Sequence, residues 1–247
     1  MTDAPPLAAG VVSLDEVDST NDEARRRAEA GAEAPLWIVA ARQTKGRGRQ
    51  GRVWEEGDGN LYATLLLRPS APSAEAALLS FAASLAVAAL FESAGAAASL
   101  KWPNDALIGG RKAAGILLEG SGSGDRLDWL AIGIGVNLVA HPPGGSDAAH
   151  PPTDLLAETG VRLAPAEALD RLAPAFDGWA ATLTRKGFAP LREAWLARAA
   201  RLGERIEART PSERLSGVFE DVDAAGALVL RTPTGRRAVH AADVYFR

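Results

Sequence analysis

The segment 42–52, RQTKGRGRQGR, carries five positive charges and three glycines, with no acidic and no apolar residue. A segment without apolar residues has nothing to bury in a core, so we predict a loop. Its glycines let backbone N–H groups approach an anion, and guanidinium groups pair with carboxylate or phosphate through two parallel hydrogen bonds. Arg47, Arg49 and Arg52 therefore indicate a site for a small anionic ligand.

Other interpretations of this loop fit less well. Residues 46–51 match G-x-G-x-x-G, but a dinucleotide fold needs a preceding strand, a helix that opens within the motif and a later acidic residue on a second strand. Here the sequence continues as loop through 52–59, and the phosphate-binding motif G-x-x-x-x-G-K-[ST] does not occur. A solvated basic loop or an RNA-binding Gly-Arg segment is the alternative. Trp54 is the only aromatic residue beside the loop, and the net charge of −4 gives no wider basic surface.

A second cluster of polar side chains is Lys101-Trp102-Pro103-Asn104-Asp105. We expect a strand that ends at the proline and presents an amide and a carboxylate. Lys112 follows seven residues after Asp105, beyond a Gly-Gly pair that is typical of a hairpin turn. Such a hairpin would bring Asp105 and Lys112 together at the opening of one site. An ordinary turn with solvated charges is the alternative.

Lysine and asparagine are scarce, and most of them fall in chemically unusual segments. The 27 basic residues comprise 23 Arg and four Lys, namely Lys45, Lys101, Lys112 and Lys186. The four asparagines are Asn21, Asn60, Asn104 and Asn137. Because Arg serves wherever a positive charge is sufficient, a retained Lys indicates a position where an ammonium group is needed. For any single Asn, chance and turn preference are the alternative.

Composition excludes several classes of protein. The 247 residues, 47% hydrophobic and 23% charged, suffice for one large domain with or without a small appendage. The absence of cysteine excludes disulfides, Cys-ligated zinc, iron–sulfur clusters and thiol catalysis. We find no secretory signal, and the most apolar segment, 76–91, is short for a membrane-spanning helix. We therefore expect a cytoplasmic protein with no membrane partner.

The periodicity of apolar residues predicts an α+β (mixed α/β) fold, since strands and helices interleave up to about residue 200. Expected strands are 11–17, 36–41, 60–67, 99–102, 106–108, 114–119 and 127–138. Expected helices are 22–30, 73–93, 166–185 and 190–200, the third restarted at Pro174. From Gly203 onward, about five short alternating runs predict a small all-β unit, so we divide the chain into domains 1–202 and 203–247.

Four motifs, in this order, resemble those of the biotin protein ligases. They are Asp18-Ser19-Thr20-Asn21, the segment 43–52, the segment 101–105 with 111–117, and Gly133-Ile134-Gly135-Val136-Asn137-Leu138. The resemblance covers essentially the whole chain. It implies a class II synthetase-like catalytic domain, with a mixed sheet and flanking helices, followed by a small SH3-like β-barrel. About ten residues precede the first expected strand, so the chain resembles the ligases that lack an N-terminal DNA-binding domain.

The resemblance implies two reactions. Biotin is activated with ATP to biotinyl-5'-AMP, with release of pyrophosphate, and is then transferred to a specific lysine of a biotin carboxyl carrier protein. ATP and biotin are the substrates, and Mg²⁺ accompanies ATP because two anions must meet in the first step. No nucleic-acid partner is implied, and a homodimer is compatible with the resemblance.

Residue roles are carried over from the same resemblance. Biotin is assigned to Ser19, Thr20, Asn21, Gln43, Gly46, Arg47, Gly48, Gly115 and Leu117. ATP and the adenylate are assigned to Arg47, Arg49, Arg52, Trp54, Asn104, Lys112 and Asn137, with the two asparagines at the adenine edge. The catalytic residues are Arg49, Lys112 and Asp105, and Asp105 is also the candidate metal ligand. Two departures from the family pattern are Gln50, where the glycine loop commonly has another Arg, and Pro174, inside a helix that is usually continuous.

The nearest alternative is a lipoate or octanoyl ligase or transferase, which shares the catalytic fold. Both kinds of enzyme bind an acyl group that a carrier lysine then attacks. A lipoyl or octanoyl chain needs a long apolar tunnel, whereas the ureido head of biotin needs neutral hydrogen-bond donors and acceptors. Gln43, Ser19 and Thr20 therefore favour biotin.

Overall fold

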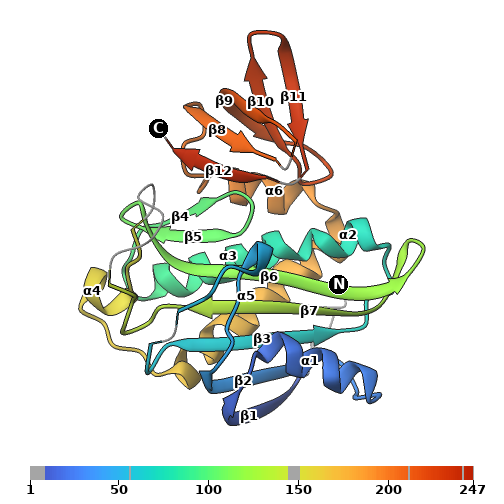
Figure 1. Ribbon diagram of the computed structural model, residues 1–247, viewed down its shortest axis with the longest axis vertical. Helices are drawn as coiled ribbons and strands as arrows, with labels where there is room; N and C mark the ends of the chain where they lie inside the picture. Colours follow the sequence, from blue (N-terminus) through green and yellow to red (C-terminus); the bar gives the residue numbers. More distant parts are fainter. Residues whose placement is uncertain (1–8, 56, 144–150, 211, 241, 247) are drawn as a thin grey trace.

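A computed structural model describes residues 9–55, 57–143, 151–210, 212–240 and 242–246. Its larger sheet has seven strands in the spatial order β1-β2-β3-β7-β6-β5-β4. The strands are β1 (Gly10–Val17), β2 (Leu36–Gln43), β3 (Leu61–Leu67), β4 (Ala98–Lys101), β5 (Asp105–Ile108), β6 (Arg111–Ser123) and β7 (Arg126–Val136). Only the β1–β2 pair is parallel, so this sheet is mixed, as predicted (Figure 1).

Helices pack on both faces of the sheet and leave one part of it for the site. Helix α1 (Thr20–Glu29) contacts β2, β3 and β7. The other face is covered by α3 (Leu79–Ser93) and α5 (Pro165–Lys186), and α6 (Ala189–Leu196) packs against both of these helices and against the C-terminal sheet (Figure 1). Shorter pieces are α2 (Ser73–Ala77), α4 (Leu155–Thr159) and the 3₁₀ turn η1 (Arg49–Gly51).

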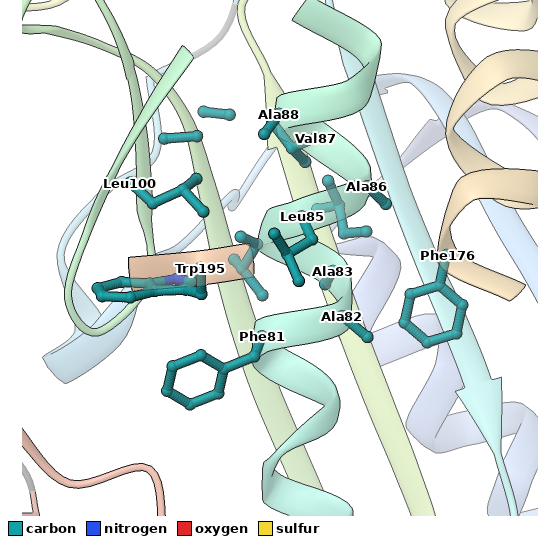
Figure 2. Close-up of a cluster of buried hydrophobic side chains, with 14 of the residues drawn as sticks. Phe81, Ala82, Ala83, Leu85, Ala86, Val87, Ala88, Leu100, Phe176 and Trp195 are labelled. Atoms are coloured by element: carbon teal, nitrogen blue, oxygen red, sulfur yellow. The ribbon is translucent and has the colours of Figure 1, made fainter. Parts of the chain in front are cut away.

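Helix α3 is the centre of the larger core. Its side chains Phe81 and Leu85 are almost fully buried, and Phe81 contacts the Trp195 ring edge-on with 5.5 Å between ring centroids (Figure 2). The stretch Ser73–Ser93 is the one described helix that is long and apolar enough to cross a membrane, and 67% of its most apolar window is buried within the protein. A helix that is apolar all round belongs in a core of this kind.

Strand β7 shows how the two faces of the sheet differ. Leu130, Ile132, Ile134 and Val136 point into the core around α3. On the opposite face, Trp129 and Ala131 pack under α1. The next two residues on that face are Gly133 and Gly135, where an added Cβ would lie 2.3 Å from Asn21 Oδ1 and 2.8 Å from the Trp54 ring respectively. The glycines therefore let a helix and a loop lie directly on the sheet.

The C-terminal part of the chain is a five-stranded antiparallel sheet in the order β11-β10-β9-β8-β12. Its strands are β8 (Arg205–Arg209), β9 (Arg214–Val222), β10 (Leu228–Thr232), β11 (Gly235–Val239) and β12 (Asp243–Phe246). It is joined to the first part by the Trp102 indole, which donates to the Gly226 carbonyl at 3.0 Å, and by an ion pair of Arg192 with Asp221. The small SH3-like β unit expected from the sequence is thus present.

Three local expectations were wrong. Helix α5 runs without interruption through Pro174, because Leu172 and Phe176 on either side are fully buried and their packing outweighs the missing backbone N–H. The last helix, α6, ends at Leu196 rather than near residue 200. Strand β6 is 13 residues long, more than twice the expected run, because it pairs with β7 far beyond the sheet's apolar centre.

Candidate active site

A cavity of about 420 Å³ lies on the α1 face of the large sheet and extends to the C-terminal sheet. Every site residue predicted from the sequence lines it except Gly46. Gly46 lies in the loop against Trp54 and Gln43, where a Cβ would be 3.0 Å from the Trp54 carbonyl oxygen and 3.1 Å from Gln43 Nε2. Three segments far apart in the sequence, around residues 20, 50 and 105, therefore meet in one cavity.

One end of the cavity is neutral, and we call it the head pocket. It consists of Ser19, Thr20, Asn21 and Gln43, each less than 9% exposed. Helix α1 starts at Thr20 with Ser19 extended before it, so the first turn of the helix presents these side chains to the end of β2. Gln43 Oε1 accepts the backbone N–H of Thr20 at 2.8 Å. Among the described residues, no acceptor is hydrogen-bonded to Gln43 Nε2, which is left for a ligand carbonyl.

Asn21 lies in the head pocket with its amide fully used by the protein. Its Nδ2 donates to Glu119 Oε2 at 2.8 Å, and its Oδ1 accepts the Thr64 hydroxyl at 2.7 Å. Gly133 leaves the space for this amide on the sheet. Asn21 therefore holds neighbouring groups in place.

The other end of the cavity, which we call the cationic end, consists of Arg47, Arg49, Arg52 and Lys112. Arg47 is paired with Asp22 at 2.5 Å and with Glu119 at 2.9 Å. The hydrogen bond to Asp22, and after it the one to Glu119, raise the pKa of the Arg47 guanidinium despite its partial burial. Two carboxylates of the protein thus occupy the positions where ligand anions would pair with this side chain.

Arg49 and Arg52 reach the C-terminal sheet. Arg49 donates to the Ala242 carbonyl at 3.2 and 3.3 Å, and among the described residues no carboxylate is within ion-pair distance of it. Burial lowers the pKa of Arg49, which still stays protonated. Burial also tends to lower the pKa of Arg52, but its hydrogen bond to Asp243 acts in the opposite direction, and on balance the pKa of Arg52 is raised. The Arg52 guanidinium lies 2.5 Å from a carboxylate oxygen of Asp243. Arg49 is therefore the cation with neutral partners only.

Lys112 and Asp105 meet as the predicted hairpin requires. Strands β5 and β6 place the ammonium 2.7 Å from Asp105 Oδ1, while Lys101 lies 3.9 Å from the other carboxylate oxygen. Lys112 Nζ also lies over the Trp54 ring, 5.4 Å from its centroid. The backbone of Lys112 is hydrogen-bonded on both sides, to Pro151 and Thr153. The backbone of this lysine is therefore fixed by hydrogen bonds, and its ammonium is held by Asp105 and the Trp54 ring.

The remaining predicted residues line the same cavity. The Trp54 ring rests on the strand glycines, 2.8 Å from a Cβ built on Gly115, and its indole N–H is buried with no acceptor in the described part of the chain. Asn104 Nδ2 donates to the Ile116 carbonyl at 2.8 Å. Asn137 Nδ2 donates to the Thr153 carbonyl at 2.9 Å. Leu117 lines the cavity as well, and its carbonyl accepts the Asn21 amide at 3.4 Å.

Four side chains that hydrogen-bond or pair with the predicted site residues were not singled out from the sequence: Thr64, Asp22, Glu119 and Asp243. A polar Thr in an otherwise apolar strand was the one signal available for Thr64. Asp22 lies in a charged run, whereas Glu119 and Asp243 have no charged residue within three positions, and nothing in the local sequence relates them to Arg47 or Arg52. For a metal, the described residues contain no group of three or more potential ligands. Asp105 is a single carboxylate. One carboxylate suits Mg²⁺ that is bound mainly by the phosphate oxygens of a nucleotide, and it does not suffice for a site made by the protein alone.

Comparison with known proteins gives matches over most of the chain. The model of the biotin/lipoate A/B protein ligase family matches residues 14–137, and that of the biotin protein ligase C-terminal domain matches 202–247. The biotin–[acetyl-CoA-carboxylase] ligase of Paracoccus denitrificans is 51% identical over 94% of this chain and 99% of its own length. The bifunctional ligase/repressor BirA of Bacillus subtilis is 33% identical over 93% of this chain but only 72% of its own length.

Solved structures agree with the sequence matches. The biotin protein ligase from Aquifex aeolicus, in complex with biotin and ATP, superposes with a TM-score of 0.80 and 27% identity. The match covers 96% of this chain and 98% of that one. The similarity therefore extends over both sheets and the cavity between them.

Proposed function

The chain belongs to the biotin/lipoate A/B protein ligase family, and from this premise we propose that it activates biotin with ATP and transfers it to a lysine of a biotin carboxyl carrier protein. One observation carries the proposal: a neutral head pocket and a cationic end share one cavity. A ureido ring needs uncharged donors and acceptors, whereas a carboxylate and a triphosphate need cations. Biotin and ATP together present these two chemistries.

For biotin, we propose that the head pocket holds the ureido ring, with Ser19, Thr20 and Gln43 in contact and Asn21 behind them. Leu117 and Gly115 would line the path of the acyl chain. Arg47, Gly48 and Arg49 would close over the carboxylate and the α-phosphate. This assignment is supported by the position of the head pocket at the closed, buried side of the cavity.

In the first reaction, a biotin carboxylate oxygen attacks the α-phosphorus of ATP, and the bond to the bridging oxygen breaks as pyrophosphate leaves. Lys112 would bridge the carboxylate and the α-phosphate, because an ammonium is a compact charge with freely directed donors. Arg49 would stabilise the charge that develops on the phosphoryl oxygens. Arg52, Trp54, Asn104 and Asn137 would line the nucleotide side. We place Mg²⁺ with the ATP phosphates, where it would neutralise their charge, and Asp105 is the carboxylate that would bind it.

In the second reaction, the amine of the acceptor lysine attacks the acyl carbon of biotinyl-AMP, AMP leaves with the bond electrons, and the amine loses a proton. The product is an amide on the carrier protein. The cationic end is lined by Asp243, Val244 and Tyr245 of β12 as well as by the glycine loop, and the Arg52 side chain is 54% exposed there, so we place the entry of the acceptor lysine at this end. We place the reaction in the cytoplasm, and the boundary between the catalytic and C-terminal domains at residues 202 and 203, close to the separate family match that begins at 202.

The test is pyrophosphate release from ATP by the purified wild-type protein. We expect release only when biotin is added, and incorporation of biotin into a purified biotin carboxyl carrier domain in a second step. Lipoate and octanoate, added in place of biotin, are expected to support neither step. Release that follows octanoate or lipoate but not biotin would assign the protein to the alternative branch of the family.

A further inference from the structure

Thr64 is a buried polar residue that the proposed chemistry does not use. It lies on β3 in register with Ile38 of β2 and Gly133 of β7, with no measurable exposure. Nearby side chains on this face of the sheet, such as Leu66 and Ala131, are apolar and belong to the core under α1. A hydroxyl in such a position costs free energy unless hydrogen bonds compensate it. The Thr64 hydroxyl lies where the apolar core under α1 meets the head pocket.

The hydroxyl of Thr64 joins two residues of the head pocket. It lies 2.7 Å from Asn21 Oδ1 and 2.8 Å from Thr20 Oγ1. Thr20 Oγ1 in turn lies 3.0 Å from Gln43 Oε1. These contacts form a chain of neutral groups, Asn21–Thr64–Thr20–Gln43, that runs from the sheet to the cavity.

The number of protons in this hydrogen-bonded series determines which donors and acceptors it presents to a ligand. Asn21 Oδ1 can only accept, since the amide nitrogen is the atom that donates to Glu119. Thr20 has one hydroxyl proton and two protein oxygens within reach, those of Thr64 and Gln43. With that proton used inside the protein, Thr20 presents a lone pair to the cavity. Gln43 Oε1 is occupied by the Thr20 backbone N–H, so Gln43 presents its N–H₂ group.

We infer that Thr64 is a positioning residue that makes the head pocket specific for a ligand group with an N–H donor beside a carbonyl acceptor. A cyclic urea has both, and an alkyl chain or a dithiolane ring has neither. Thr64 acts through Thr20 and Asn21. Without its hydroxyl, Asn21 Oδ1 loses its donor, and Thr20 loses one of the two partners that keep its hydroxyl turned into the protein. This inference rests on the proposed function and specifies how the same site selects its acyl substrate.

The test compares Thr64→Val and Thr64→Ala, which remove the hydroxyl, with Thr64→Ser, which keeps it. In the assay of pyrophosphate release, we expect KM for biotin to rise about tenfold for Val and Ala, equivalent to ~1.4 kcal/mol. KM for ATP and kcat should stay within about twofold. Desthiobiotin, which keeps the urea, should show the same rise as biotin. Thr64→Ser should return KM for biotin to near the wild-type value.

The matched control is Ser84→Ala. Ser84 is 2% exposed and donates to the Phe81 carbonyl within α3, on the opposite face of the sheet. It removes a buried hydroxyl with no link to the head pocket, so KM for biotin should not change. An unchanged KM in Thr64→Val and Thr64→Ala, equal rises for biotin and ATP, failure of Ser to restore binding, or loss of folding in both variants would each overturn the inference. A wild-type protein that releases no pyrophosphate with biotin would instead refute the proposed function.

Discussion

The two ends of the cavity satisfy their polar groups in opposite ways. In the head pocket, neutral side chains are less than 9% exposed and hydrogen-bonded to one another in a fixed chain. At the cationic end, side chains such as Arg47 and Arg52 are 28% and 54% exposed and are paired with carboxylates of the protein. The head pocket is therefore formed by contacts within the protein, and we expect the cationic end to exchange its carboxylate partners when an anionic ligand binds.

Exchange of partners has an energetic consequence. Asp22, Asp105 and Asp243 occupy positions beside Arg47, Lys112 and Arg52 that substrate anions would otherwise take. Binding of a carboxylate or phosphate then replaces one ion pair with another, so only the difference contributes to affinity. Arg49 is the exception, because its partners are neutral. Variants at the cationic end distinguish cations that are paired with a carboxylate from the one that has neutral partners.

Lys112→Arg is expected to have the largest effect. If the ammonium bridges a carboxylate and the α-phosphate, the wider planar guanidinium cannot occupy its position without displacing one of them. We expect biotin-dependent pyrophosphate release to fall by about 10³ for Lys112→Arg and for Lys112→Ala, at the upper end of the loss for one transition-state contact. The melting temperature should stay within a few degrees, since the side chain is 32% exposed.

The matched control is Lys186→Arg at the exposed end of α5. It makes the same chemical change away from the cavity and should leave the rate unaltered. A fully active Lys112→Arg enzyme would show that this lysine does not touch the reacting groups, since exposed ion pairs contribute only about 0 to 1 kcal/mol.

Arg49→Ala should come next. Its guanidinium is available to an anion without prior loss of a carboxylate partner, so its whole contact contributes to catalysis. Removal of one such contact costs ~2 to 4 kcal/mol, a factor of ~10² to 10³ in rate. We expect slow adenylation and release of free biotinyl-AMP. Arg42→Ala, on the same segment but paired with Glu16 outside the cavity, is the control. Wild-type adenylation with no loss of biotinyl-AMP in Arg49→Ala would contradict the role.

The fold was largely predictable because apolar periodicity reports burial. Strands and helices were placed within a few residues, and the small β unit was recognised from its short alternating runs. Pro174 was misjudged because a local rule about proline says nothing of the buried side chains beside it. The full length of β6 was missed chiefly because its outer end, residues 120–123, is exposed and lacks an apolar pattern.

The site was predictable in its cations and not in their partners. Arg47 could be identified from the glycine loop, but its partner Glu119 is 72 residues away and on another strand. The contacts of the scarce asparagines could not be predicted either: Asn104 and Asn137 donate to backbone carbonyls, and Asn60 Oδ1 accepts three successive backbone N–H groups from Leu138 to Ala140. Contacts of this kind depend on the register between distant strands, which a single sequence does not display.

The smallest effect is expected from Asp243→Asn, which tests whether a carboxylate of the C-terminal sheet stands in for a phosphate. Arg52 and Asp243 are 54% and 21% exposed, so their pairing is worth at most about 1 kcal/mol. If Asp243 competes with ATP for Arg52, the neutral variant should lower KM for ATP by up to about fivefold and leave KM for biotin unaltered. High salt should reduce the difference, because screening weakens exposed pairs. Glu220→Gln, which breaks a pair with Arg236 within the same small sheet, should change neither constant. A rise in KM for ATP would instead mean that Asp243 holds the loop in its working position.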